Sequence, residues 1–143
     1  MIITFIGHRE VAEKPKIKML LNTAIESLIK KGAEEFFLGG YGEFDIMAAH
    51  SVLFFKTKYP GIRSTIILPY PNKKYDKYLY TSSLYPPLET VPKKYAIIKR
   101  NEWMISHADM VIAYITHDWG GAARTYKYAK RLGKSIILLT DAV

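Results

Sequence analysis

The chain has 143 residues, 49% of them hydrophobic and 24% charged, which is typical of one globular domain with one core. Its formal net charge of +8 favours anionic partners such as nucleotides, phosphosugars or nucleic acid, although dispersed lysines on a hydrated surface give the same balance. Cysteine is absent, which excludes disulfides, thiolate metal sites and cysteine nucleophiles and is expected of a cytoplasmic protein. No run approaches the roughly 18 to 20 apolar residues that span a bilayer, so we expect no membrane partner.

The first half of the chain alternates between predicted strands and helices. Residues 2–7 (IITFIG) are β-branched and aromatic, which predicts a buried strand and not a signal peptide, because a basic start and a long apolar segment are missing. Apolar residues at helical spacing predict a helix over 14–31, and EEFFLGG predicts a strand over about 34–38. A second helix is predicted over 43–59, stopped by a Pro-Gly pair, and a third strand over 64–69.

Residues 70–91 break this alternation. They are rich in Tyr, Pro and Lys and predict a long loop with one short strand near Ser83–Tyr85. Long loops in compact domains often serve as lids or binding segments, and the alternative is a floppy excursion that is not packed on the domain.

The second half of the chain returns to the alternating pattern. A helix opened by proline is predicted over 92–107, a strand over 110–115, a helix ending at Leu132 after a glycine turn, and a last strand over 135–140. Alternating strands and helices favour parallel pairing with right-handed crossovers. We therefore predict an α/β fold over residues 1–143, a single three-layer domain with a mostly parallel sheet of five to six strands.

Three predicted strand ends carry glycine beside polar side chains. They are Gly7-His8-Arg9, Gly39 to Asp45, and Thr116 to Gly121 with Arg124 in the next helix. In open parallel sheets, ligands bind beyond the carboxyl ends of the strands, and glycine turns before helix N-termini bind anions. The spacing fits neither the dinucleotide fingerprint nor the P-loop, so we expect no bound cofactor.

Several side chains near these ends are candidates for ligand contact. Arg9 suits a phosphate clamp or a surface cap, and His8 suits acid–base work or a hydrogen bond within its own loop. Arg100 and Asn101 face either the crevice or solvent. His117 can touch a ligand, but without a second histidine beside it we predict no metal site. Trp119 belongs either to the core or to an interface, as do Trp103, Met104 and Tyr126, and we expect the core for all four.

Two carboxylates, Glu43 and Asp45, stand beside the glycines of the second strand end. A carboxylate repels phosphate but accepts hydrogen bonds from ribose hydroxyls, and it can stabilise the cation formed in N-glycosidic cleavage. The alternative is that both acids favour the helix start through its dipole, by roughly 0.3 to 1 kcal/mol each. We assign Glu43 mainly to the helix and Asp45 to the ribose.

Four segments in this order resemble the SLOG superfamily: the start IITFIGHR, GGYGEFDIMAA, KRNEWMISHADMVIAYI and GGAARTYKYAKRLGK. These are Rossmann-like nucleotide-binding domains related to the LOG phosphoribohydrolases and to the DNA-processing Rossmann domain, and small stand-alone bacterial and phage members are similar to this chain. The resemblance implies a pocket for a nucleotide or a nucleotide-derived sugar. It implies that the pocket is lined by Gly7, Arg9, Gly39, Gly40, Gly42, Asp45, Arg100, Asn101, Gly120 and Gly121.

The sequence departs from the LOG enzymes at their PGGxGTxxE loop. The counterpart here, HDWGGAART, has no Glu four residues after its glycines, which argues against phosphoribohydrolase activity. We therefore predict a protein that senses or sequesters a nucleotide or nucleotide-derived sugar such as ADP-ribose. Two alternatives remain: an N-glycosidase acting on a nucleoside monophosphate with Asp45 or Glu43 as the catalytic carboxylate, and a DNA-binding module. Members of this superfamily often self-associate, so a homodimer is also expected.

Overall fold

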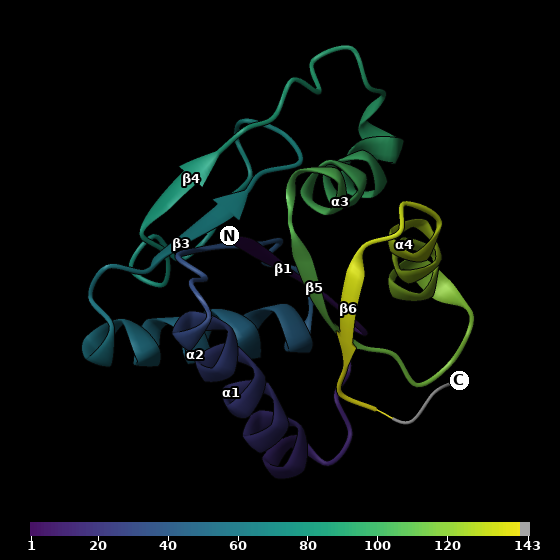
Figure 1. Ribbon diagram of the computed structural model, residues 1–143. Coiled ribbons are helices and arrows are strands. Elements are labelled where there is room, and N and C mark those ends of the chain that lie inside the picture. The colour runs from purple at the N-terminus through teal and green to yellow at the C-terminus, as the bar shows by residue number, and fades with distance from the viewer. Residues whose placement is uncertain (141–143) are drawn as a thin grey trace.

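Six parallel strands form one sheet in the computed structural model, which describes residues 1–140 (Figure 1). Their order across the sheet is β4-β3-β2-β1-β5-β6, and every neighbouring pair is parallel. The strands are β1 Ile2–Gly7, β2 Glu35–Leu38, β3 Arg63–Ile67, β4 Ser82–Leu84, β5 Met110–Tyr114 and β6 Ser135–Leu138. The predicted parallel sheet of five to six strands is thus confirmed.

Four α-helices cover the two faces of the sheet. Helices α1 and α2 lie on one face, and α3 and α4 lie on the other (Figure 1). Their bounds are α1 Lys14–Lys30, α2 Glu43–Lys58, α3 Ala96–His107 and α4 Gly120–Arg131, and a short 3₁₀ turn, η1 Lys93–Tyr95, leads into α3. None of these helices, all within residues 1–140, is long and apolar enough to cross a membrane.

The strands are apolar on both faces, because helices cover both. In β1, Ile3 and Phe5 pack in the cluster that contains α1 and α2, whereas Ile6 packs with Ile105 of α3 and Ala129 of α4. Each large apolar side chain buried in this way stabilises the fold by roughly 1.5 to 3 kcal/mol. Continuous apolar runs such as IITFIG are therefore expected of parallel strands covered on both sides.

The segment 70–91 is packed against the domain. Its short strand β4 pairs with β3, close to the predicted position, and Leu79, Tyr80 and Leu88 are buried. It is therefore not an unpacked excursion.

The chain reverses its direction across the sheet between β1 and β5. From β1 the following strands are added on one side, through β2 and β3, whereas β5 and then β6 lie on the other side. The connections leaving β1 and β5 thus diverge, and the space between them is where ligands bind in doubly wound folds. Close packing maintains this edge: the ring of Phe44 from α2 occupies the position that a side chain on Gly7 would need.

Candidate functional site

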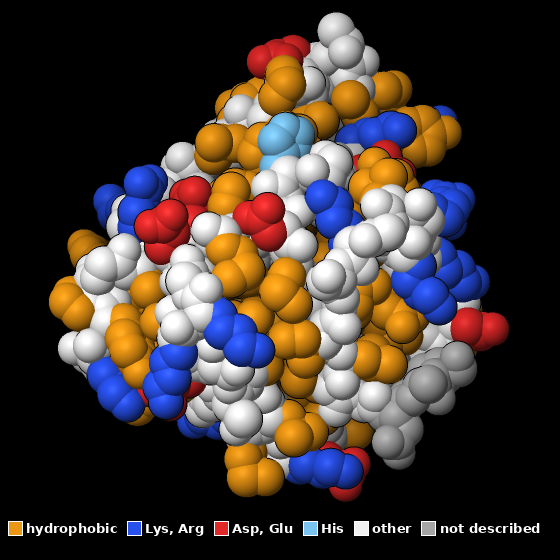
Figure 2. All heavy atoms as spheres, in the orientation of Figure 1, with side chains coloured by type: hydrophobic (Ala, Val, Ile, Leu, Met, Phe, Trp, Pro, Cys, Tyr) orange, Lys and Arg blue, Asp and Glu red, His pale blue; other side chains and the backbone are white. Residues whose placement is uncertain are grey.

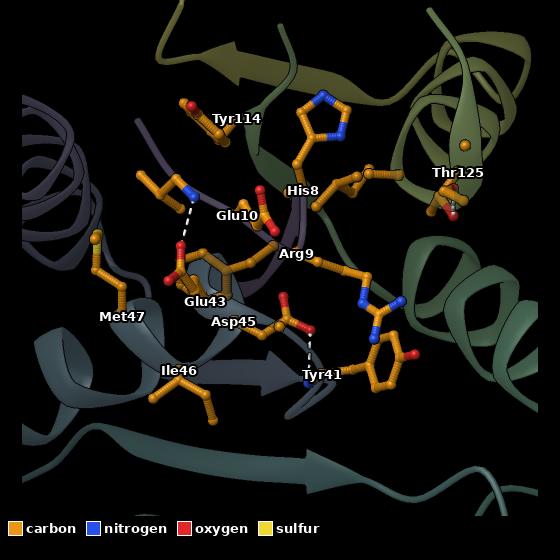
Figure 3. A pocket seen from close by; sticks show the side chains of 18 of the residues that line it. His8, Arg9, Glu10, Tyr41, Glu43, Asp45, Ile46, Met47, Tyr114 and Thr125 are labelled. Carbon is orange, nitrogen blue, oxygen red and sulfur yellow. Dashed lines mark hydrogen bonds between the residues drawn. The ribbon is translucent and has the colours of Figure 1, made fainter. Parts of the chain in front are cut away.

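A large cleft opens at this edge, between the diverging ends of β1 and β5 (Figure 3). The loop after β1, the first turns of α2 and α4, and one face of α3 line it. Ten of the residues singled out from the sequence meet there: Gly7, His8, Arg9, Gly42, Glu43, Asp45, Arg100, Asn101, Gly120 and Gly121. The topology therefore brings together four segments that are far apart in the sequence.

Three of the predicted site residues do not line the cleft. Gly39 lies behind it, where its carbonyl accepts a hydrogen bond from Arg100. Gly40 adopts a positive φ of 67° and packs beside Ile66 and Tyr80. Arg124 is exposed on α4. The two glycines thus shape the turn after β2 from behind the cleft.

Arg100 is almost completely buried, with 2% of its surface exposed. Its Nη1 donates to the carbonyl oxygens of Gly39 at 2.8 Å and Ile67 at 2.9 Å, and its Nε donates to Oδ1 of Asn101 at 2.8 Å. The solvent-facing alternative for Arg100 is therefore wrong. The guanidinium joins the carboxyl ends of β2 and β3 from below the cleft.

Asp45 lies beside this buried guanidinium. A side chain added to Gly39 would come within 3.0 Å of Asp45 Oδ2 and 3.3 Å of Arg100 Cζ, so the two charged groups flank that glycine. Burial raises the pKa of Asp45 from 3.8 to about 6, against the opposing effects of the Arg100 charge and of the Tyr41 N–H, which donates to Oδ2 at 3.1 Å. Asp45 is therefore a carboxylate that can gain or lose a proton near neutral pH.

Glu43 has a different environment, although it is only two residues away. Its carboxylate accepts a hydrogen bond from the Val11 N–H at 2.6 Å and forms an ion pair with Lys14 at 3.0 Å (Figure 3). The Val11 hydrogen bond and Lys14 lower the pKa of Glu43. Glu43 thus fastens the loop after β1 to the start of α2, whereas Asp45, which also lines the cleft, has no ion-pair partner among residues 1–140.

Arg9 lies over the ring of Tyr41, with Cζ 4.9 Å from the ring centre (Figure 3). Its carbonyl accepts the N–H of Glu43 at 2.8 Å. Gly42, with φ of 94°, permits this contact, because a side chain there would come within 2.8 Å of the Cα of Arg9. The guanidinium is thereby held at the mouth of the cleft.

Three aromatic rings form a column at the opposite wall. The ring centre of His117 lies 3.7 Å from that of His8, with 14° between the two ring planes. It lies 3.8 Å from the ring centre of Trp119, with 19° between the planes. Nε2 of His8 accepts the N–H of Thr116 at 3.0 Å, so neutral His8 carries its proton on Nδ1. Burial, and to a lesser degree His117, lowers the pKa of His8.

The position of Trp119 contradicts the expectation that it belongs to the core. It is 69% exposed and lines the cleft at the end of the column. The hydrophobicity of a lone tryptophan favoured burial, and only its place next to the Gly120-Gly121 turn indicated otherwise. Met104, in contrast, is buried as expected.

Helix α4 begins directly after Trp119, at the end of the aromatic column. Its first residue, Gly120, has φ of 91°, and no side chain caps its N-terminus. The first turn of a helix carries N–H groups without intrahelical partners, and here Gly120, Gly121 and Ala122 line the cleft. The arrangement suits an anion. Within residues 1–140, no three His, Cys, Asp or Glu side chains cluster as metal ligands would.

Comparison with known proteins identifies relatives of this fold. A family model described as YpsA, the YspA SLOG family, matches residues 6–135. DNA processing protein A from Helicobacter pylori, described with a single-stranded DNA binding mode, superposes with a TM-score of 0.70 and 20% identity, covering 100% of this chain and 66% of that one. DNA processing protein A from Streptococcus pneumoniae superposes with a TM-score of 0.70 and 16% identity, covering 99% of this chain and 50% of that one.

A further structure, TM1055, has a TM-score of 0.64 and 17% identity and covers 94% of this chain and 71% of its own. Among curated proteins none matches this chain. The chain thus spans just under two thirds of the Helicobacter protein and half of the Streptococcus protein. At these identities the structural likeness establishes a Rossmann-like fold.

Proposed function

The chain belongs to the YspA SLOG family, and on that premise we propose that its cleft binds a nucleotide or a nucleotide-derived sugar. Family and fold support a nucleotide-related or DNA-binding Rossmann-like module. The observation that favours a nucleotide is the pairing, in one cleft, of the uncapped N-terminus of α4 with the carboxylate of Asp45. Free amides suit a phosphate and a carboxylate suits ribose hydroxyls.

The charges of the cleft favour a small ligand over a nucleic acid strand. Basic and acidic side chains line the cleft in equal number. The basic ones are Arg9, Lys14 and Arg100, and the acidic ones are Glu10, Glu43 and Asp45. A groove that follows a polyphosphate backbone is expected to be uniformly basic. Figure 2 shows Lys and Arg spread over the visible face among acidic and hydrophobic side chains, not gathered in one patch. The net charge of +8 is thus not concentrated in the cleft.

A second candidate function, N-glycosidic cleavage of a nucleoside monophosphate, rests on Asp45. Its pKa of about 6 suits a group that exchanges protons near neutral pH. Glu43, by contrast, is engaged by Val11 and Lys14 and is the weaker candidate. Release of free base by the wild type, lost in Asp45→Asn, would favour this enzyme over a protein that only senses or sequesters its ligand.

Thermal unfolding with a panel of ligands tests binding directly. The panel contains AMP, cyclic nucleotides, ADP-ribose, NAD and ribose 5-phosphate. A ligand at 100 times its Kd stabilises the folded state by about 2.7 kcal/mol, which raises the midpoint of a domain of this size by roughly 5 to 15 °C.

The variants locate the site. Arg9→Ala and Asp45→Ala are expected to abolish the shift, and Arg124→Ala, an exposed arginine outside the cleft, is the matched control. No shift with any ligand, together with salt-dependent retention of single-stranded DNA, would replace the proposal with the DNA-binding alternative.

A further inference from the structure

The aromatic column of His8, His117 and Trp119 has one open end. His8 is fixed from below by the Thr116 N–H, and His117 is held between its two neighbours at 3.7 and 3.8 Å, which is van der Waals contact. Trp119 has His117 as its ring partner on one face, and no other aromatic ring of residues 1–140 stacks on it. Its side chain is 69% exposed, so the column presents a wide, fixed, apolar ring to solvent.

The open ring adjoins the free amides of α4. Trp119 is the residue that immediately precedes this helix, so its ring and the first-turn N–H groups belong to one turn. A side chain added to Gly120 or Gly121 would meet no atom within 4 Å, which shows that the space above these two residues is open. The ring of Trp119 and open space beside the first turn of α4 thus belong to the same part of the cleft.

We propose that the outer face of Trp119 is the stacking platform for the base of a free nucleotide whose phosphate binds the first turn of α4. This inference deepens the proposed function and rests on it, because it names the part of the ligand that gives affinity. A base has an aromatic face that a sugar phosphate lacks, and a ring already held by its neighbours loses little freedom when a base stacks on it. The ligand class is therefore a purine or pyrimidine nucleotide, in preference to a phosphosugar without a base.

Fluorescence gives a direct test, because the chain has two tryptophans and Trp103 lies outside the cleft, stacked on His107 and tilted against Phe37. In Trp103→Phe, Trp119 is the single tryptophan. AMP is expected to quench its emission, and ribose 5-phosphate is not. An AMP titration that leaves the emission of this variant unchanged, while calorimetry shows binding, would overturn the platform.

Affinity gives an independent test. Stacking on one base is worth about 5- to 150-fold in affinity when the aromatic ring is replaced by alanine. Trp119→Ala is expected to weaken the binding of AMP by that factor and to leave the affinity for ribose 5-phosphate unchanged. Trp119→Phe is expected to retain most of the affinity for AMP. The phenylalanine variant and the fluorescence measurement keep the test decisive if the alanine variant does not fold.

The remaining outcomes separate this inference from the proposed function. If AMP and ribose 5-phosphate bind the wild type equally and Trp119→Ala changes neither, the cleft binds a sugar phosphate and the platform is refuted. If neither binds and no other nucleotide of the panel does, the proposed function fails and the platform fails with it. If a single-stranded (dT)10 quenches Trp119 but AMP and dTMP do not, the base belongs to a nucleic acid and the free-nucleotide ligand is wrong.

Discussion

Replacing Asp45 with asparagine is expected to stabilise the protein at neutral pH. The folded state raises the pKa of Asp45 from 3.8 to about 6, because burial disfavours its ionised form. The folded state therefore binds the Asp45 proton more tightly than the unfolded chain does. The associated stability is complete below the ordinary pKa and is lost as the pH rises through about 6.

The structure sets the size of this effect. One pKa unit corresponds to about 1.36 kcal/mol, so a change from 3.8 to about 6 corresponds to at most about 3 kcal/mol. Asp45 lines an open cleft, and solvent that reaches part of its carboxylate reduces that value. Asparagine has nearly the shape of the protonated acid and cannot ionise. We expect Asp45→Asn to be about 1 to 3 kcal/mol more stable than the wild type at pH 7.5 and nearly equal to it at pH 4.

Urea unfolding of both proteins at the two pH values measures the difference. Glu43→Gln is the matched control, since the Val11 hydrogen bond and Lys14 lower the pKa of Glu43. That variant is expected to be less stable than the wild type at pH 7.5, with the deficit shrinking below the ordinary pKa of Glu43, as the pH falls through its lowered folded-state pKa. If Asp45→Asn is instead the less stable protein at pH 7.5, then Asp45 and Arg100 form a stabilising pair, and the reasoning from burial is refuted.

Other substitutions test the packing around the cleft. Gly7→Ala is expected to destabilise the fold by about 1 to 3 kcal/mol in urea unfolding, because its methyl group overlaps the ring of Phe44. Arg100→Lys is expected to cost about 1.5 to 3 kcal/mol, measured in the same way, since one ammonium cannot reproduce the bonds to two strand ends. Gly42→Ala is expected to lower the thermal midpoint more than Gly120→Ala: both have positive φ, but only Gly42 has backbone within 2.8 Å of the added methyl group. If Gly42→Ala and Gly120→Ala lower the midpoint equally, the loop after β1 moves away from the added methyl group at little cost.

Local patterns predicted the fold because most of its information is local. The apolar run of 2–7 and the helical spacing of 14–31 correspond to β1 and α1 within a residue or so. The alternation of the two element types then leaves few ways to pair the strands other than in parallel. The start of α3 differs from its prediction because residues 93–95 form a 3₁₀ turn, which the same apolar spacing does not distinguish from an α-helix.

The environments of single side chains could not be predicted in this way, because they depend on contacts between distant segments. Arg100 is a charged residue on a helix, which favours exposure. It is nevertheless buried, because its guanidinium donates hydrogen bonds to two carbonyls that are more than 30 residues away in the sequence. Trp119 is large and apolar, which favours burial, yet it is exposed and stacks on His117, which in turn stacks on His8. Most of the residues predicted for the site line the cleft at this edge of the sheet, but the burial of Arg100 and the exposure of Trp119 were not predicted.

The two acids beside the glycines of the second strand end bear on how one cleft could hold both the ribose and the phosphate of a nucleotide. Glu43 is neutralised by Lys14 and the Val11 N–H, so it does not repel an anion strongly. Asp45 remains at the start of α2, whereas the first turn of α4 carries no acid. The two helix N-termini are therefore not equivalent: the one with Asp45 suits hydroxyl groups, and the one without an acid suits a phosphate. A bound nucleotide is thus expected to lie across the switch point, with its ribose toward Asp45 and its phosphate toward α4.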